Sequence, residues 1–124
     1  MINSGSDTIW EYILGRTAIS NLGSLCHAFA CAPLYFLQTG VLGIKPLQPG
    51  FREFSINPCL AGITQAQGVV PTPYGDISIS LVKQNMNHIE IKMKIPQGTC
   101  GLTSDERRLS SGQQEFTLPY MEKK

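Results

Sequence analysis

The chain has 124 residues, which is enough for one ordinary domain, or for a small domain with a helical appendage, but too short for two full domains. Ten lysine and arginine residues stand against nine aspartate and glutamate residues, so the net charge is +1. Because the basic residues are scattered along the chain, no basic patch is available for nucleic acid, and we expect no nucleic-acid partner.

The N-terminal segment MINSGSDTIWE has no basic residue ahead of its acidic Asp7 and Glu11, so it does not have the pattern of a signal peptide. The expected compartment is therefore cytoplasmic by default. TIWEYIL at 8–14 predicts a short element, and the turn-forming residues that follow it predict a loop.

A helix is predicted from an N-cap at Ser24 to about Gln38, and Pro33 should kink it or divide it in two. Apolar side chains recur along it at three- and four-residue spacing, namely Leu25, Phe29, Ala32, Phe36 and Leu37. The other faces are also apolar, so the helix should need neighbours on several sides. Polar residues and glycines dilute the uncharged run around it, and we expect no membrane span.

The four cysteines are Cys26, Cys31, Cys59 and Cys100, and they form no C-x-x-C pair. We expect free and mostly buried thiols. Cys26, His27 and Cys31 lack a fourth ligand for zinc, so the sequence predicts no metal and no other cofactor.

After Gly40 the sequence becomes rich in proline, and we place a domain boundary there, with a helical segment at 1–40 and a sandwich at 41–124. The second part alternates apolar and polar residues in five runs, at 54–56, 63–70, 76–82, 88–95 and 115–118. The predicted fold class is α+β, a short N-terminal helical segment followed by an antiparallel β-sandwich.

Two turns and one buried face support this sandwich. PTPYGD at 71–76 and KQNMNH at 83–88 carry the residues that tight reversals require. In the run at 88–95, one face is entirely apolar, with Ile89, Ile91, Met93 and Ile95. Ile77, Ile79 and Leu81 should form a second buried face.

Two residues stand out as candidates for chemistry, and each has an ordinary alternative. His27 begins an apolar run and is either a core histidine or part of a site. Glu11 lies between Trp10 and Tyr12 and is either a surface residue or a base whose pKa burial has shifted.

Four motifs in order resemble the C-terminal end of bacterial α-L-rhamnosidases, a family of glycoside hydrolases. They are TIWE (8–11), SLCHAF (24–29), VLGIKPLQPGF (41–51) and VPTPYGDISIS (70–80). In that family a barrel of helices carries the catalytic site and precedes a small β-sandwich. The resemblance implies that residues 1–40 are a remnant of the helical catalytic barrel and that the rest is the C-terminal sandwich.

The resemblance also implies roles for the two candidates. The family hydrolyses terminal α-L-rhamnosides with inversion, which needs one carboxyl group as acid and one as base. Glu11 matches the general base, and His27 matches a histidine that binds the sugar. The other carboxylates match no motif of the family: Asp7, Glu53, Asp76, Glu90, Asp105, Glu106, Glu115 and Glu122.

The chain is thus expected to be a C-terminal fragment of a rhamnosidase-like hydrolase that acts on a rhamnose-containing glycoside only as part of the complete enzyme and is inactive alone. The alternative is a non-catalytic sandwich that serves as a scaffold or as a carbohydrate-binding module. Its candidate aromatic side chains are Phe51, Phe54, Tyr74, Phe116 and Tyr120. The apolar helix further predicts self-association through residues 9–40.

Overall fold

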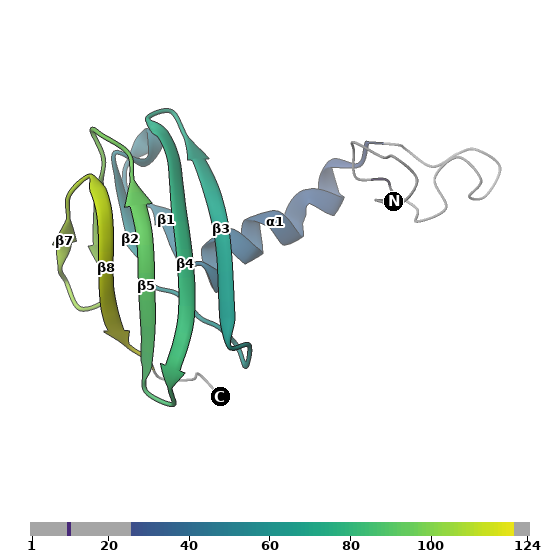
Figure 1. Ribbon diagram of the computed structural model, residues 1–124. Coiled ribbons are helices and arrows are strands. Elements are labelled where there is room, and N and C mark those ends of the chain that lie inside the picture. Colours follow the sequence, from purple (N-terminus) through teal and green to yellow (C-terminus); the bar gives the residue numbers. More distant parts are fainter. Residues whose placement is uncertain (1–9, 11–25, 121–124) are drawn as a thin grey trace. The chain divides into compact units, whose positions relative to one another are not determined.

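The structure is a computed structural model that describes Trp10 and residues 26–120 (Figure 1). The chain divides into two units, Met1–Phe36 and Leu37–Lys124. In the first unit the described residues form short helical pieces, and in the second they form a β-sandwich.

Three helical pieces follow one another along the chain: the 3₁₀ turn η4 (Ala28–Cys31), α1 (Ala32–Phe36) and the π turn η5 (Leu37–Val41). Pro33 lacks an N–H, so it fits the first turn of an α-helix better than its middle. The helix type accordingly changes beside Pro33, where a division was predicted. In η5, the Leu42 N–H donates to the Leu37 carbonyl at 3.0 Å, which closes the π turn.

Among the described residues, helical backbone begins at Ala28, so the prediction that His27 lies inside the helix is wrong. His27 has an extended backbone, with φ −112° and ψ 105°, and it is the N-cap of η4. The Ala30 N–H donates to the His27 carbonyl at 3.0 Å, which closes a 3₁₀ turn that begins after His27. The predicted N-cap, Ser24, lies outside the described residues.

The two pieces η4 and α1 bury none of their residues. All four cysteines are free, as expected, but Cys26 and Cys31 are exposed and Cys59 and Cys100 are half-buried. The prediction of mostly buried thiols is therefore wrong. Cys26 precedes η4 and Cys31 ends it, and η4 buries none of its residues.

The sandwich consists of two four-stranded sheets, which confirms the predicted α+β class. The first sheet has the order β1-β2-β6-β7, made of Ile44–Pro46, Glu53–Ile56, Cys100–Thr103 and Arg108–Leu109. The second has the order β3-β4-β5-β8, made of Gln65–Thr72, Gly75–Asn85, His88–Ile95 and Gly112–Pro119. Figure 1 shows the four strands of the second sheet side by side.

The five alternating runs are confirmed as β2, β3, β4, β5 and β8. Both predicted apolar faces are buried, since Ile77, Ile79 and Leu81 and the four apolar residues of β5 are each at most 3% exposed. The two predicted turns are tight: Thr72 pairs with Gly75, and Asn85 pairs with His88.

The sequence did not predict β1, β6 or β7, and it predicted a purely antiparallel sandwich. Strands β2 and β6 pair in parallel, with Glu53 opposite Cys100 and Ile56 opposite Thr103. The three missed strands have three, four and two residues, too few to show a period of two.

The core lies between the sheets, and β2 and β6 pack closely against each other in it. Phe54 and Ile56 are 0% exposed, and they pack beside buried Gly101. A Cβ at Gly101 would lie 2.7 Å from Ile56 Cδ1 and 3.3 Å from the Phe54 ring, so a larger residue does not fit there without displacement. This core fixes the strands whose ends carry the loops described below.

Candidate functional site

The predicted general base Glu11 lies outside the described residues, so the geometry around it is not part of this structure. Its neighbour Trp10 is described and is half-buried. The role of Glu11 stays a prediction.

His27, which is predicted to bind the sugar, is half-buried and precedes η4. Its ring makes no capping hydrogen bond to η4, and its centroid lies 5.5 Å from that of Phe29 at an interplanar angle of 57°. A neutral imidazole carries one donor and one acceptor, which suits a sugar hydroxyl. Because Glu11 lies outside the described residues, the arrangement of His27 relative to it is not part of this structure.

The described carboxylates lie in the sandwich, and several are held by cations. Lys92 lies 3.1 Å from both Glu90 and Glu115, and Arg108 pairs with Glu53. A general acid needs a raised pKa. The pKa of Asp105 is instead lowered, first by the hydrogen bond from Arg107 at 2.9 Å and then by that from Thr103. Asp76 and Glu106 are exposed. Among the described residues none has the environment of a general acid.

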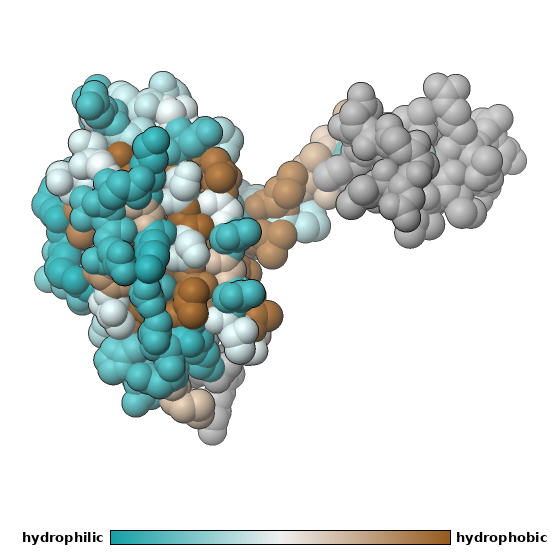
Figure 2. All heavy atoms as spheres, viewed as in Figure 1, coloured by the Kyte–Doolittle hydropathy of each residue, from teal (hydrophilic) through white to brown (hydrophobic). Residues whose placement is uncertain are grey.

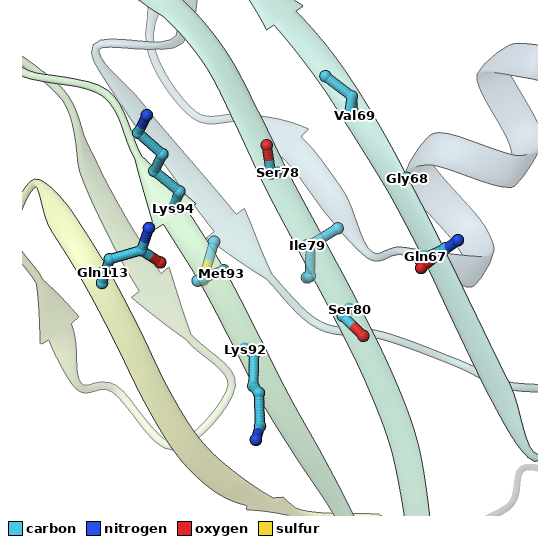
Figure 3. Close-up of a pocket in the computed structure, with 10 residues that line it drawn as sticks. All are labelled: Gln67, Gly68, Val69, Ser78, Ile79, Ser80, Lys92, Met93, Lys94 and Gln113. Carbon is cyan, nitrogen blue, oxygen red and sulfur yellow. The ribbon is translucent and has the colours of Figure 1, made fainter.

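The outer face of the second sheet has an open hollow of about 550 Å³ (Figure 3). Two rows of paired residues cross it: Gln67, Ser80 and Lys92 in one, and Val69, Ser78, Lys94 and Gln113 in the other. Hydrogen bonds from Lys92 to Glu115 and Glu90 raise the pKa of Lys92, so its charge is neutralised locally. No aromatic ring lines the hollow, and Figure 2 shows this face as largely hydrophilic.

A second candidate lies where three loops meet, and we call it the Tyr74 corner: Gly50, Arg52, Tyr74 and Gly98. Tyr74 is at the tip of the β3–β4 hairpin, where its N–H donates to Thr72 Oγ1 at 3.1 Å. Arg52 Nε donates to the Tyr74 hydroxyl at 3.5 Å, and this hydrogen bond raises the pKa of Arg52. The corner joins two sequence motifs, at 41–51 and 70–80, whose functions were unassigned.

Backbone conformation and two glycines shape this corner. Gly50 and Phe51 have φ of 69° and 64°, and the left-handed region is rare for an aromatic residue. A Cβ at Gly98 would lie 3.2 Å from Tyr74 Cδ1, so the ring packs directly on this glycine. The Cys100 N–H donates to the Arg52 carbonyl at 3.0 Å, which ties the two supporting loops together.

The described residues bring no three His, Cys, Asp or Glu side chains together as metal ligands. No helix among them is both long and apolar enough to cross a membrane.

Comparison with known proteins assigns the sandwich to a family. Residues 43–117, more than half of the chain, match the model of the bacterial alpha-L-rhamnosidase C-terminal domain. The chain belongs to this family. The α-L-rhamnosidase of Alteromonas sp. (strain LOR) is 38% identical over 86 residues, covering 64% of this chain and 9% of the relative. That of Formosa agariphila is 30% identical over 104 residues, covering 79% of this chain and 11% of the relative.

Solved structures of α-L-rhamnosidases share the fold. The enzyme from Dictyoglumus thermophilum superimposes with a TM-score of 0.68 at 16% identity, covering 97% of this chain and 17% of the other. The Streptomyces avermitilis enzyme, solved in complex with L-rhamnose, gives 0.68 at 18% identity, covering 94% of this chain and 14% of the other. The chain is therefore related to the C-terminal part of α-L-rhamnosidases and spans only a small share of their length.

The family resemblance seen in the sequence motifs is thereby confirmed, whereas the roles of Glu11 and His27 are not tested. Arg52 and Gly98 of the Tyr74 corner were missed by the sequence analysis. The signal for them was weak, because Arg52 only follows the motif at 41–51 and Gly98 stands in a separate turn.

Proposed function

We propose that the chain supplies the C-terminal part of an inverting α-L-rhamnosidase. The observation that best supports this is the 38% identity with the Alteromonas α-L-rhamnosidase over 86 residues. In this proposal Glu11 activates the attacking water as general base, and His27 binds hydroxyl groups of the rhamnose unit.

The proposal also requires a second carboxyl group from elsewhere. Inverting hydrolysis places the acid and the base about 6.5 to 9.5 Å apart on opposite sides of the sugar. The described carboxylates are either paired with cations or exposed, as shown for Glu90 and Asp76. We therefore propose that the isolated chain is inactive and that the general acid belongs to a helical catalytic region outside it.

A chimera tests the proposal: this whole chain replaces the segment of the Alteromonas enzyme that corresponds to it, the position of Glu11 included. With an aryl α-L-rhamnoside, the isolated chain should show no turnover and the chimera should be active. Glu11→Gln in the chimera should lower kcat by about 10² to 10⁴, the range of a lost general base. His27→Ala should mainly raise KM.

Azide separates a catalytic role of Glu11 from a structural one. A small anion that needs no deprotonation can replace the activated water, so azide should restore turnover of the Glu11→Gln chimera. Asp7→Asn is the matched control, because it removes a neighbouring carboxylate and should leave kcat unchanged. An isolated chain with robust turnover, or a Glu11→Gln chimera with full activity, would contradict the proposal.

A non-catalytic carbohydrate-binding role is the second candidate, and one observation favours a specific place for it. Of the five aromatic side chains considered, Phe54 and Tyr120 are buried and Phe51 and Phe116 are half-buried. Tyr74 is the only one of the five that is exposed, at 38%.

A further inference from the structure

We propose that the Tyr74 corner is a carbohydrate-binding subsite that holds one pyranose unit of a glycan. The choice of a rhamnoside as the first ligand to test rests on the proposed function. The subsite itself rests on the geometry of the corner.

The first argument is the exposed ring. Among residues 37–120, Tyr74 is the only aromatic residue among the exposed large hydrophobic side chains. A tyrosine ring offers an apolar face for the C–H groups of a sugar and a hydroxyl at its edge for hydrogen bonding. The other phenylalanine and tyrosine rings at 37–120 are buried or half-buried.

The second argument is that the ring is held in place before any ligand arrives. It rests on Gly98, where a Cβ would lie 3.2 Å from Tyr74 Cδ1, and it lies near Gly50, where a Cβ would lie 3.9 Å from Cε2. The tip of the hairpin is further fixed by Thr72, whose Oγ1 donates to the Gly75 carbonyl at 2.6 Å. A preorganised platform loses little conformational freedom on binding.

The third argument is the set of hydrogen-bonding groups beside the ring. Arg52 uses Nε for the Tyr74 hydroxyl, and its terminal nitrogens have no partner among the described residues. The guanidinium presents these N–H groups in a fixed fork, which suits two neighbouring sugar hydroxyls. Since the Tyr74 hydroxyl accepts from Arg52, its own proton stays available for a ligand oxygen.

The corner is also a better candidate than the hollow of Figure 3. The hollow lacks an aromatic ring, and its Lys92 is already held by Glu90 and Glu115. The corner combines an apolar face with unpaired donors, which is the usual composition of a small-ligand site.

Amide chemical-shift mapping of the intact chain tests the inference. The probes are methyl α-L-rhamnopyranoside and methyl β-D-glucopyranoside, each titrated to tens of millimolar. We expect saturable shifts at Gly50, Tyr74 and Gly98 with at least one probe. An absence of shifts there with both probes, or shifts confined to other residues, would overturn it.

Variants distinguish binding at the ring from loss of the fold. Tyr74→Leu keeps an apolar side chain on Gly98 but removes the ring, so affinity should fall at least tenfold. Tyr74→Phe keeps the ring and should lose less, and Arg52→Gln should weaken binding too. The amides of Ile77 and Ile79 report whether each variant remains folded.

Val69→Ala, in the hollow, is the matched control and should leave binding unchanged. If Val69→Ala abolishes the shifts and Tyr74→Leu does not, the hollow is the binding surface and the inference is wrong. The test does not depend on catalysis: an inactive chimera with binding at the corner would reject only the proposed function, and an active chimera without binding would reject only the subsite.

Discussion

At the scale of single residues, a missing side chain can matter as much as one that is present. Gly101 lies in β6 with the packed side chains of Phe54 and Ile56 against it. A Cβ there would lie 2.7 Å from Ile56 Cδ1, closer than real contacts allow, and both neighbours are 0% exposed. The neighbours therefore have no solvent-filled space into which they can move.

We therefore predict that Gly101→Ala lowers the free energy of unfolding by about 1 to 3 kcal/mol, the usual cost of overpacking a core. Gly40→Ala is the matched control, because a Cβ at Gly40 meets nothing within 4 Å. It should be neutral or slightly stabilising, since alanine is favoured over glycine in helical backbone. Urea denaturation monitored by circular dichroism measures both, and equal stabilities for the two variants would contradict the packing argument.

The candidate site shows what residue-level reading of the sequence could reach. Phe54 lies in a predicted strand and Tyr74 in a predicted turn, and composition alone does not tell the buried ring from the exposed one. The Tyr74 corner needs loops from three distant parts of the chain, so its assembly depends on the fold. The roles of Glu11 and His27 were assigned only through the family resemblance, and the described residues do not test them.

At the scale of elements, long alternating strands were predictable and short ones were not. Strand β5 was predicted with its observed limits, His88–Ile95, because a period of two repeats over its eight residues. Strand β7 pairs with β6, and β6 also pairs with β2, which is far away in the sequence. These two strands therefore depend on the fold and not on a local pattern. The helix start differs for a local reason, since His27 has an extended backbone and its carbonyl accepts the 3₁₀ hydrogen bond that closes η4.

The same elements should differ in how fast their amides exchange with solvent. Strands β4 and β5 are paired on both sides, and their inward residues are buried, so opening them requires disruption of the core. We predict the slowest amides in these two strands, around Ile79 and Ile91. The pieces η4 and α1 bury no residue and should exchange fastest among the described elements.

Hydrogen exchange followed by mass spectrometry or NMR measures this order in the intact chain. The edge strand β3 is a useful internal control, because it is in the same sheet but paired only with β4. Protection concentrated in residues 26–38 would contradict the prediction and would show that the helical pieces are the stable part.

At the scale of the whole molecule, an unusual feature is the amount of apolar surface on the helical pieces. The exposed fractions are 85% for Phe29, 62% for Tyr35 and 65% for Phe36, and Figure 2 colours much of this segment as hydrophobic. Each such ring buries roughly 150 to 250 Å² when fully covered, so the three rings together expose roughly 400 Å². That is about half of the ~800 Å² that one partner contributes to a standard interface.

Leu34 and Leu37, in the same helical pieces, are also exposed, at 60% and 54%. Because apolar surface of this extent on a monomer normally marks an interface, we propose that a second copy of the chain covers it. The predicted interface is residues 9–40, of which residues 9 and 11–25 lie outside the described part. The domain boundary predicted after Gly40 likewise stays a prediction.

Light scattering on the intact chain should therefore find a dimer or a larger oligomer at micromolar concentration. The double substitution Phe29→Ser with Phe36→Ser should shift it toward the monomer, because both side chains lie in the helical pieces and neither is buried in the sandwich core.

Val69→Ser with Val82→Ser is the matched control: it also removes two exposed apolar side chains, at 59% and 40% exposure, but from the outer face of the second sheet. If the intact chain is monomeric, or if the control disrupts the oligomer and the helical substitutions do not, self-association through the helical segment is wrong. The upstream part of the Alteromonas enzyme can also be added to the oligomer. If a one-to-one complex replaces the oligomer, the helical surface binds the upstream part in the complete enzyme, and a second copy covers it only when that part is absent.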